Sequence, residues 1–352
     1  MIAALLLALA LPLRAAEPEA VVQRVVIKTE KLMAAQKGKD AREIRDLDRE
    51  AEGLYSQVKP LGWKAAPALG KAVQDLKLHT KTRLVAASFL GLIRDPAAFP
   101  PLEDIVLNVD QAPSVRASAA QSLPGQGAPD AVVGKVLCSV LAEPDLPREV
   151  LAESLLTLSR LGCVDTAELA RLARAFGPRP SAADLPLAKA ALSALGRSRG
   201  RESGLQLLSH IGYFPPQGEV RAAAIKALDA RRAEIATWLA PDALPVVTEA
   251  LRSESERWDT MLPLVRLAAA LGPDGGKALS RLTRHPDAEV LAEAAEALVA
   301  FKDIEAIPAL ESVVAGAMND PRFSPREGRP DPAVSLARLE KAVAALRRAR
   351  PQ

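Results

Sequence analysis

A short pattern repeats along this 352-residue chain: an apolar residue is followed eight positions later by leucine, with alanine and other small residues between them. The clearest copies are Val220–Leu228 and Val290–Leu298. The leucines that end the seven copies are Leu90, Leu123, Leu158, Leu195, Leu228, Leu271 and Leu298. Their spacings run from 27 to 43 residues, with a mean of about 35. A period of this length, made of two helices, is typical of an α-solenoid, in which each unit stacks on its neighbours.

A turn and a second apolar helix follow each copy of the pattern. Asp95 and Asp303 stand in such turns, where an aspartate accepts a hydrogen bond from a free N–H group at the start of a helix. Pro96 suits the first helical position because it lacks the N–H group that would be unpaired there. We therefore predict an all-α superhelix of about eight stacked antiparallel helix pairs, with an extra short helix near 233–239 in the 43-residue unit.

The composition agrees with a helical chain. Hydrophobic residues make up 49% of the sequence but aromatic residues only 3%, which disfavours a β-sandwich or barrel. Alanine and leucine, which dominate instead, have the highest helix propensities. Charged residues are 25% and the formal net charge is +3, so the composition has no bulk nucleic-acid signature.

The units resemble HEAT repeats, and most closely the short bacterial repeats grouped with phycobilisome lyases. Val115-Arg116, Val220-Arg221 and Ile307-Pro308 carry that likeness, together with the Ala-Ala-x-Ala-Leu stretch that ends at Leu298. The resemblance implies a HEAT/armadillo-like fold whose second helices line a concave face that binds a partner.

The domain organisation follows from the extent of the repeats. We expect capping helices and a first degenerate repeat over 17–80, the HEAT-like array over 81–315, a proline-rich loop over 316–331 and a C-terminal capping helix over 332–352. The apolar run Ile2–Leu13, followed by Arg14-Ala15-Ala16, predicts a signal peptide over 1–16. The alternative is a frayed, buried helix or a misread start. No later segment has eighteen uninterrupted apolar residues, so no membrane span is expected in the mature chain.

Cys138 and Cys163 are the only two cysteines. The repeat register places Cys138 within a helix and Cys163 at a turn, so we favour two buried, unpaired side chains over a disulfide.

Familiar catalytic motifs are missing from the sequence. It has no Gly-x-Ser-x-Gly, no phosphate-binding glycine loop, no His-Glu-x-x-His and no Cys-x-x-Cys. The histidines, His79, His210 and His285, are expected in linkers of different units, where they would not meet at one metal ion. We therefore expect no catalytic residue, cofactor or metal site, and predict that the chain is not an enzyme.

Basic residues recur at helical spacing on the predicted second helices. Pointing outward, they would form a basic stripe for an acidic peptide or polysaccharide. The alternative is an ordinary solvated face, balanced by nearby glutamates. The residues of the stripe are Arg171, Arg174, Arg252, Lys277, Arg281 and Arg284. A second basic cluster falls in turns within units and could form a basic edge; its members are Arg197, Arg199, Arg201, Arg231 and Arg232.

Aromatic side chains in inter-unit linkers are further candidates for partner contact. Tyr213 and Phe214 lie in the linker 212–218, and Trp258 lies in the segment 253–259. Phe214 packed under its own loop is an equal alternative, and Trp258 poses the same choice. Trp63 and Trp238 are assigned to packing.

Together these features predict an exported, non-catalytic protein-protein interaction scaffold that binds a protein or peptide along the concave face, in the periplasm or outside the cell. No nucleic-acid partner is expected. The alternatives are an enzyme or enzyme subunit of the HEAT-like lyase kind, and a cytoplasmic HEAT protein associated with nucleic acid.

Overall fold

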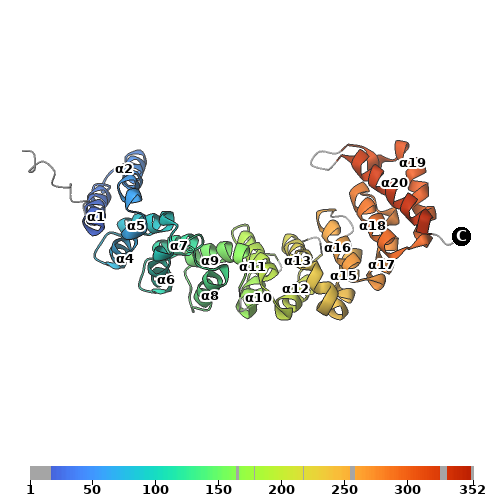
Figure 1. Cartoon of the computed structure of the whole chain (residues 1–352), viewed down its shortest axis with the longest axis horizontal. Coiled ribbons are helices and arrows are strands. Elements are labelled where there is room, and N and C mark those ends of the chain that lie inside the picture. The colour runs from blue at the N-terminus through green and yellow to red at the C-terminus, as the bar shows by residue number, and fades with distance from the viewer. Residues whose placement is uncertain are drawn as a thin grey trace, which may run out of the picture. The chain divides into compact units, whose positions relative to one another are not determined.

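The computed structural model describes residues 17–163, 166–177, 179–216, 218–253, 258–325 and 331–349. Within these ranges every regular element is a helix and none is a strand (Figure 1). The fold is an α-solenoid of antiparallel helix pairs. The chain divides into two compact units, one ending at Leu161 and the other beginning at Gly162, and each is described separately. The predicted signal peptide over 1–16 lies outside the described residues.

The first unit consists of paired helices in two layers (Figure 1). In the first layer α5 packs on α7 and α7 on α9, while α4, α6 and α8 pack in sequence in the second layer. The described elements of this unit are α1 (Pro18–Ala34), α2 (Ala41–Gly53), α3 (Tyr55–Val58), η1 (Lys59–Ala65), α4 (Ala66–Gln74), α5 (Thr80–Ile93), η2 (Pro96–Ala98), α6 (Phe99–Leu107), α7 (Pro113–Ser122), α8 (Asp130–Leu141) and α9 (Arg148–Leu161).

The second unit repeats this arrangement. The first layer consists of helices packed in the order α11, α13, α16, α18 and α20. The second layer consists of α10, α12, α15 and α17. The described elements of this unit are α10 (Thr166–Ala175), α11 (Leu185–Arg197), α12 (Arg201–Tyr213), α13 (Glu219–Asp229), α14 (Arg232–Glu234), η3 (Ile235–Leu239), α15 (Ala240–Ser253), α16 (Trp258–Ala270), α17 (Pro273–Leu279), η4 (Ser280–Arg284), α18 (Ala288–Phe301), η5 (Ile304–Ala306), α19 (Ile307–Gly316), η6 (Ala317–Asn319), η7 (Pro321–Phe323) and α20 (Pro332–Ala349).

The repeated leucines form the core of the first-layer helices. Six of the seven are completely buried, from Leu90 in α5 to Leu298 in α18. Leu271 is the exception: it follows the last residue of α16 and is half-buried, and the buried leucine four residues earlier is Leu267. The pattern therefore predicted the right helix in the sixth repeat, but it placed the buried leucine four residues too far along the chain.

Turn residues begin the second-layer helices as predicted. The Asp95 carboxylate accepts a hydrogen bond from the Ala97 N–H at 2.9 Å, and Asp303 accepts one from Glu305 at 3.2 Å. The extra helix expected near 233–239 is present as α14 and the π-helical segment η3. Part of the expected proline-rich loop, 326–330, lies outside the described residues, and the preceding part contains the short helices η6 and η7.

Small residues allow neighbouring first-layer helices to approach closely. A Cβ atom added to Gly196 of α11 would lie 2.9 Å from both the Cβ and the carbonyl oxygen of Ala227 in α13, closer than real Cβ contacts. Gly91 of α5 faces Ser122 of α7 in the same way. Close helix packing of this kind accounts for the abundance of alanine and the shortage of aromatic residues.

Three arginines, each seven residues before a repeated leucine, are buried rather than exposed: Arg83, Arg116 and Arg221. Arg116 donates from Nε to the Val106 carbonyl oxygen at 2.9 Å and forms a bidentate ion pair with Glu143 at 2.6 and 2.7 Å. Arg83 donates to Gln111, and Arg221 to Ser253 and the Phe214 carbonyl oxygen. Each arginine therefore ties its own helix to a neighbouring segment.

The cysteines correct an expectation. Cys138 and Cys163 are both buried, as predicted, but both are disulfide-bonded and neither is a free thiol. The expectation was wrong because a repeat register shows which elements carry the cysteines but not whether their thiols are oxidised. No helix among the described residues has both the length and the apolar composition needed to cross a membrane.

Candidate functional site

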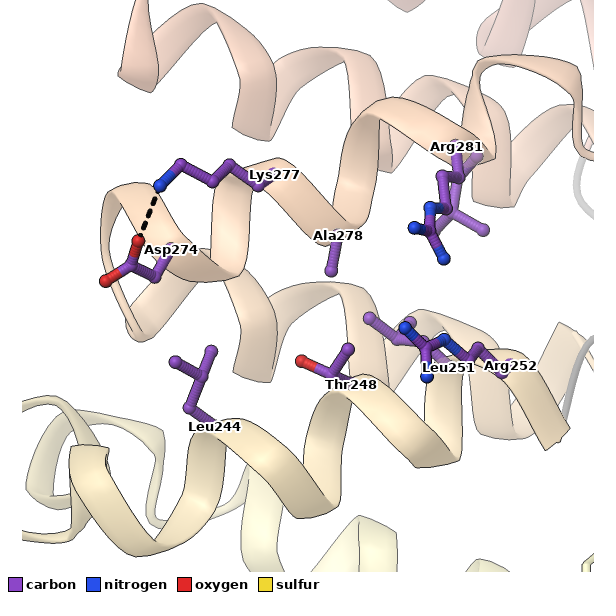
Figure 2. Close-up of a pocket in the computed structure, with 9 residues that line it drawn as sticks. Leu244, Thr248, Leu251, Arg252, Asp274, Lys277, Ala278 and Arg281 are labelled. Carbon is purple, nitrogen blue, oxygen red and sulfur yellow. Dashed lines mark hydrogen bonds and ion pairs between the residues drawn. The ribbon is translucent and has the colours of Figure 1, made fainter.

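A groove between two second-layer helices of the second unit brings together part of the predicted basic stripe. It has a volume of about 420 Å³ and lies between α15 on one side and α17 with η4 on the other (Figure 2). Arg252, Lys277 and Arg281 line it. The other lining residues are Leu244, Thr248, Leu251, Asp274, Ala278 and Leu282.

Helical spacing explains why these side chains share one groove. On α15 the lining residues are four, seven and eight positions after Leu244, which places them on one face of the helix. On α17 and η4 the lining residues follow Asp274 at three, four, seven and eight positions. Leu251 and Leu282 are buried, so the groove has an apolar floor beneath its charged rim.

The charges are unevenly distributed along the groove. Figure 2 shows Arg252 and Arg281 at one end, with their guanidinium groups on facing helices, and the Asp274–Lys277 pair at the other end. Lys277 contacts Asp274 at 2.9 Å, and this hydrogen bond raises the pKa of the lysine. Arg252 lies 3.4 Å from Glu249, and both side chains are exposed. Arg281 has no ion pair or side-chain hydrogen bond with any part of the chain that the structure describes. The Arg252–Arg281 end therefore carries an excess of positive charge.

The remaining stripe residues lie elsewhere. Arg284 lines a separate hollow with Pro286, Pro308 and Arg322. Arg171 and Arg174 are on α10, which packs on α12 rather than on α15 or α17. Arg171 pairs with Glu168, which raises the pKa of the guanidinium, and Arg174 donates to Ser209 of α12. The predicted stripe of six residues is thus not one site, and acidic neighbours balance half of it.

The predicted aromatic contacts need correction. Phe214 is only 1% exposed, packed against the rings of His210 and Tyr213, so it is part of the core and not a contact residue. Tyr213 is 51% exposed, as a contact residue must be, and Trp258 is half-buried at the start of α16. Trp63, assigned to packing, is 56% exposed, and Trp238 is also exposed.

Three of the five arginines of the second basic cluster have acidic partners, whereas Arg197 and Arg199 are exposed. Arg231 is buried and bonded to Glu234 at 2.6 Å and to the Gly200 carbonyl oxygen at 2.7 Å. Arg201 pairs with Asp242, and Arg232 with Asp229.

The histidines are dispersed, but not all are in linkers. His79 precedes α5 and accepts a hydrogen bond from the Lys81 N–H, and His285 lies between η4 and α18. His210 is instead buried within α12, because that helix continues to Tyr213. In the described ranges no three or more His, Cys, Asp or Glu side chains form a group able to hold a metal ion.

Comparison with known proteins bears on the repeats. Residues 290–316, which include most of α18 and α19, match the family described as PBS lyase HEAT-like repeat. The match therefore assigns the stretch 290–316 to a HEAT-like repeat. Human deoxyhypusine hydroxylase, solved in complex with glycerol, is a similar structure: the match covers 82% of this chain and 98% of that one, at 20% identity and a TM-score of 0.31. No curated protein sequence matches the chain.

The comparison corrects one prediction. From the missing motifs we predicted that the chain is not an enzyme, whereas the similar solved structure is an enzyme. The prediction is therefore withdrawn. At a TM-score of 0.31 the likeness carries no activity or active-site residue to this chain.

Sequence reasoning missed the apolar half of the groove. Leu244 and Leu251 are seven positions apart on α15, a spacing that the printed sequence shows, but apolar residues at that spacing normally point into the core. That they line a groove depends on how α17 and η4 lie against α15, which a single helix pattern does not contain.

Proposed function

We propose that this chain is an interaction scaffold that binds a segment of a partner protein in the groove between α15 and α17. The segment carries at least one carboxylate and apolar side chains beside it. The observation that supports the proposal is that Arg252 and Arg281 lie at the same end of a groove whose floor is formed by leucines. Neither feature alone would distinguish this surface from an ordinary solvated face.

The charged end favours a carboxylate. A guanidinium group presents a rigid fork of N–H donors that matches the two oxygens of a carboxylate. Arg281 has no acidic partner among the described residues, so it is available for such a bond without losing an existing one.

The apolar floor favours a protein segment over an acidic polysaccharide, which we considered from the sequence. Leu244 is half-buried and, with the small exposed edges of Leu251 and Leu282, offers contact area that gains free energy only when an apolar group covers it. A sugar chain would leave that part of the groove unfilled, whereas a peptide with leucine or phenylalanine near an acidic residue would fill both parts.

We also propose that the chain is exported. The apolar run Ile2–Leu13 supports this proposal, and so does the disulfide-bonded state of both cysteines, because stable disulfides are found mainly in oxidising compartments. A reporter enzyme that is active only outside the cytoplasm, fused after Ala20, is expected to be active. An inactive but intact fusion would contradict export.

The groove is tested by reversing its charge. The double variant Arg252→Glu, Arg281→Glu should weaken binding of a fluorescent peptide that combines aspartates with leucines by at least tenfold, since two attractive contacts become repulsive. Arg348→Glu on α20 is the matched control: Arg348 is exposed and lies in the other helix layer. Equal peptide affinity in the double variant and the control would rule out this groove as the binding site.

A further inference from the structure

A second cavity, in the first unit, has a different chemistry from the groove. It lies between α2 and α3 on one side and α5 on the other, and its volume is about 440 Å³. This volume is within the range of about 300 to 1,000 Å³ that is typical of small-molecule sites. The lining residues are Met33, Asp48, Glu52, Tyr55, Lys81, Leu84, Val85, Ser88, Phe89 and Leu92.

The walls of the cavity are apolar and aromatic. Met33 and Phe89 are almost completely buried at its base. The Tyr55 ring lies against the Phe89 ring with 5.3 Å between centroids and 47° between planes. The Tyr55 hydroxyl donates to the Leu92 carbonyl oxygen at 3.1 Å, which anchors α3 to the end of α5. The aromatic pair is therefore held in place and does not depend on a ligand.

The cavity exists because α2 does not pack tightly on α5. α5 packs on α7 within the array, whereas α2 packs on α1 and α3. Polar contacts bridge the cavity at one end: Lys81 donates to Gln36 at 2.7 Å and lies 3.6 Å from Asp48. On α5 the lining residues recur at three- and four-residue spacing, so one complete face of that helix is turned to the cavity.

The cavity lining carries excess negative charge. Its charged groups are Asp48, Glu52 and Lys81, a net charge of −1. Lys81 is occupied by Asp48 and Gln36. The Glu52 side chain is exposed and forms no ion pair or hydrogen bond with other described residues, which leaves one carboxylate at the rim for a ligand.

We propose that this cavity binds a small organic cation, with an apolar body against Phe89 and Leu84 and one ammonium group near Glu52 and the Tyr55 ring. A carboxylate attracts the ammonium by charge, and the face of an aromatic ring adds a cation–π contribution. An anionic ligand would face two carboxylates, and a neutral ligand would gain no attraction from Glu52. The site is independent of the groove between α15 and α17, so either proposal can fail without the other.

The test uses three ligands with one apolar body and different charges: 4-phenylbutylamine, 4-phenylbutanol and 4-phenylbutanoate. Calorimetric titration of the full chain should give the tightest binding for the amine, about two- to fivefold tighter than for the alcohol, as for an exposed ion pair. Glu52→Gln should abolish that preference while leaving alcohol binding unchanged. Glu50→Gln is the matched control, because Glu50 is on the same helix and pairs with Lys28 at 3.5 Å outside the cavity.

A second variant tests the location independently of charge. Val85→Phe adds bulk to the wall of the cavity and should reduce binding of both the amine and the alcohol at least tenfold, with the helical circular dichroism spectrum retained. The proposal is overturned if the wild-type chain does not bind the amine, if the carboxylate binds as tightly as the amine, or if Glu52→Gln and Glu50→Gln behave alike.

Discussion

Buried arginines hold the repeats of this protein together at the scale of single residues. A charged side chain in a core is stable only where its partners replace water, and Arg116 achieves this with a backbone carbonyl and a bidentate carboxylate. The repeated arginine was visible in the sequence as part of the family pattern, but its partner was not. Glu143 is 27 residues further along the chain, and Arg83 and Arg221 use Gln111 and Ser253 instead.

Replacing Arg116 should therefore cost more than the loss of a surface charge. Arg116→Met keeps the apolar stem but leaves Glu143 and the Val106 carbonyl oxygen without their donor, and we expect a loss of about 3 to 5 kcal/mol in unfolding free energy. Urea unfolding followed by circular dichroism measures it. Arg49→Met provides a comparison, because Arg49 is exposed and pairs with Asp46 three residues away at 3.1 Å, and the expected loss is below about 1 kcal/mol. Similar losses in both variants would contradict the structural role of Arg116.

His210 predicts a dependence of stability on pH. Burial lowers the pKa of His210 below its ordinary value of 6.5, and the hydrogen bonds to the Gln206 and Ala170 carbonyl oxygens only partly oppose this. The unfolded chain therefore takes up a proton near pH 6.5 that the folded chain does not. The contribution of neutral His210 to stability is complete above pH 6.5 and is lost as the pH falls towards its folded pKa.

The measurement is the urea midpoint at pH 7.5 and at pH 5.5. The wild-type urea midpoint should be lower at pH 5.5 than at pH 7.5. The midpoint of His210→Gln, which cannot titrate at this position, should decrease less. An equal fall in the two proteins would assign the pH dependence to other groups.

At the scale of helices, the sequence predicted the elements well and the contacts between them less well. Periodicity and turn chemistry are local, which is why the helix pairs and the caps at Asp95 and Asp303 were predictable. The groove, the burial of Phe214 and the exposure of Trp63 depend on neighbouring helices. In the candidate site the basic residues were predicted, whereas their division between α10, α15 and α17 was not.

Helix spacing predicts opposite effects for two glycines of the second unit. Gly196→Ala would place a Cβ atom against Ala227 of α13 and should lower the unfolding free energy by about 1 to 3 kcal/mol. Gly212→Ala in α12 meets no atom within 4 Å and should raise it by about 0.5 to 1 kcal/mol. Thermal unfolding of the two variants checks the signs, and a stabilised Gly196→Ala would show that α11 and α13 are not closely packed.

At the scale of the whole molecule, the candidate sites belong to different compact units. The organic-cation cavity lies in the unit that ends at Leu161, and the groove lies in the unit that begins at Gly162. In a solenoid each repeat contacts only its neighbours, so a substitution at one site should not alter the affinity of the other.

Crosslinking in the producing cell shows whether a partner occupies the groove between α15 and α17. A photoreactive amino acid replaces Ala278 in the groove or, as a control, the exposed Glu340 on α20. We predict a crosslinked partner from position 278 only, attached through a peptide that contains aspartate or glutamate beside apolar residues, and its loss when Arg252 and Arg281 are changed to glutamate. An equal yield from both positions, or a crosslink that persists in the charge-reversed chain, would contradict the account.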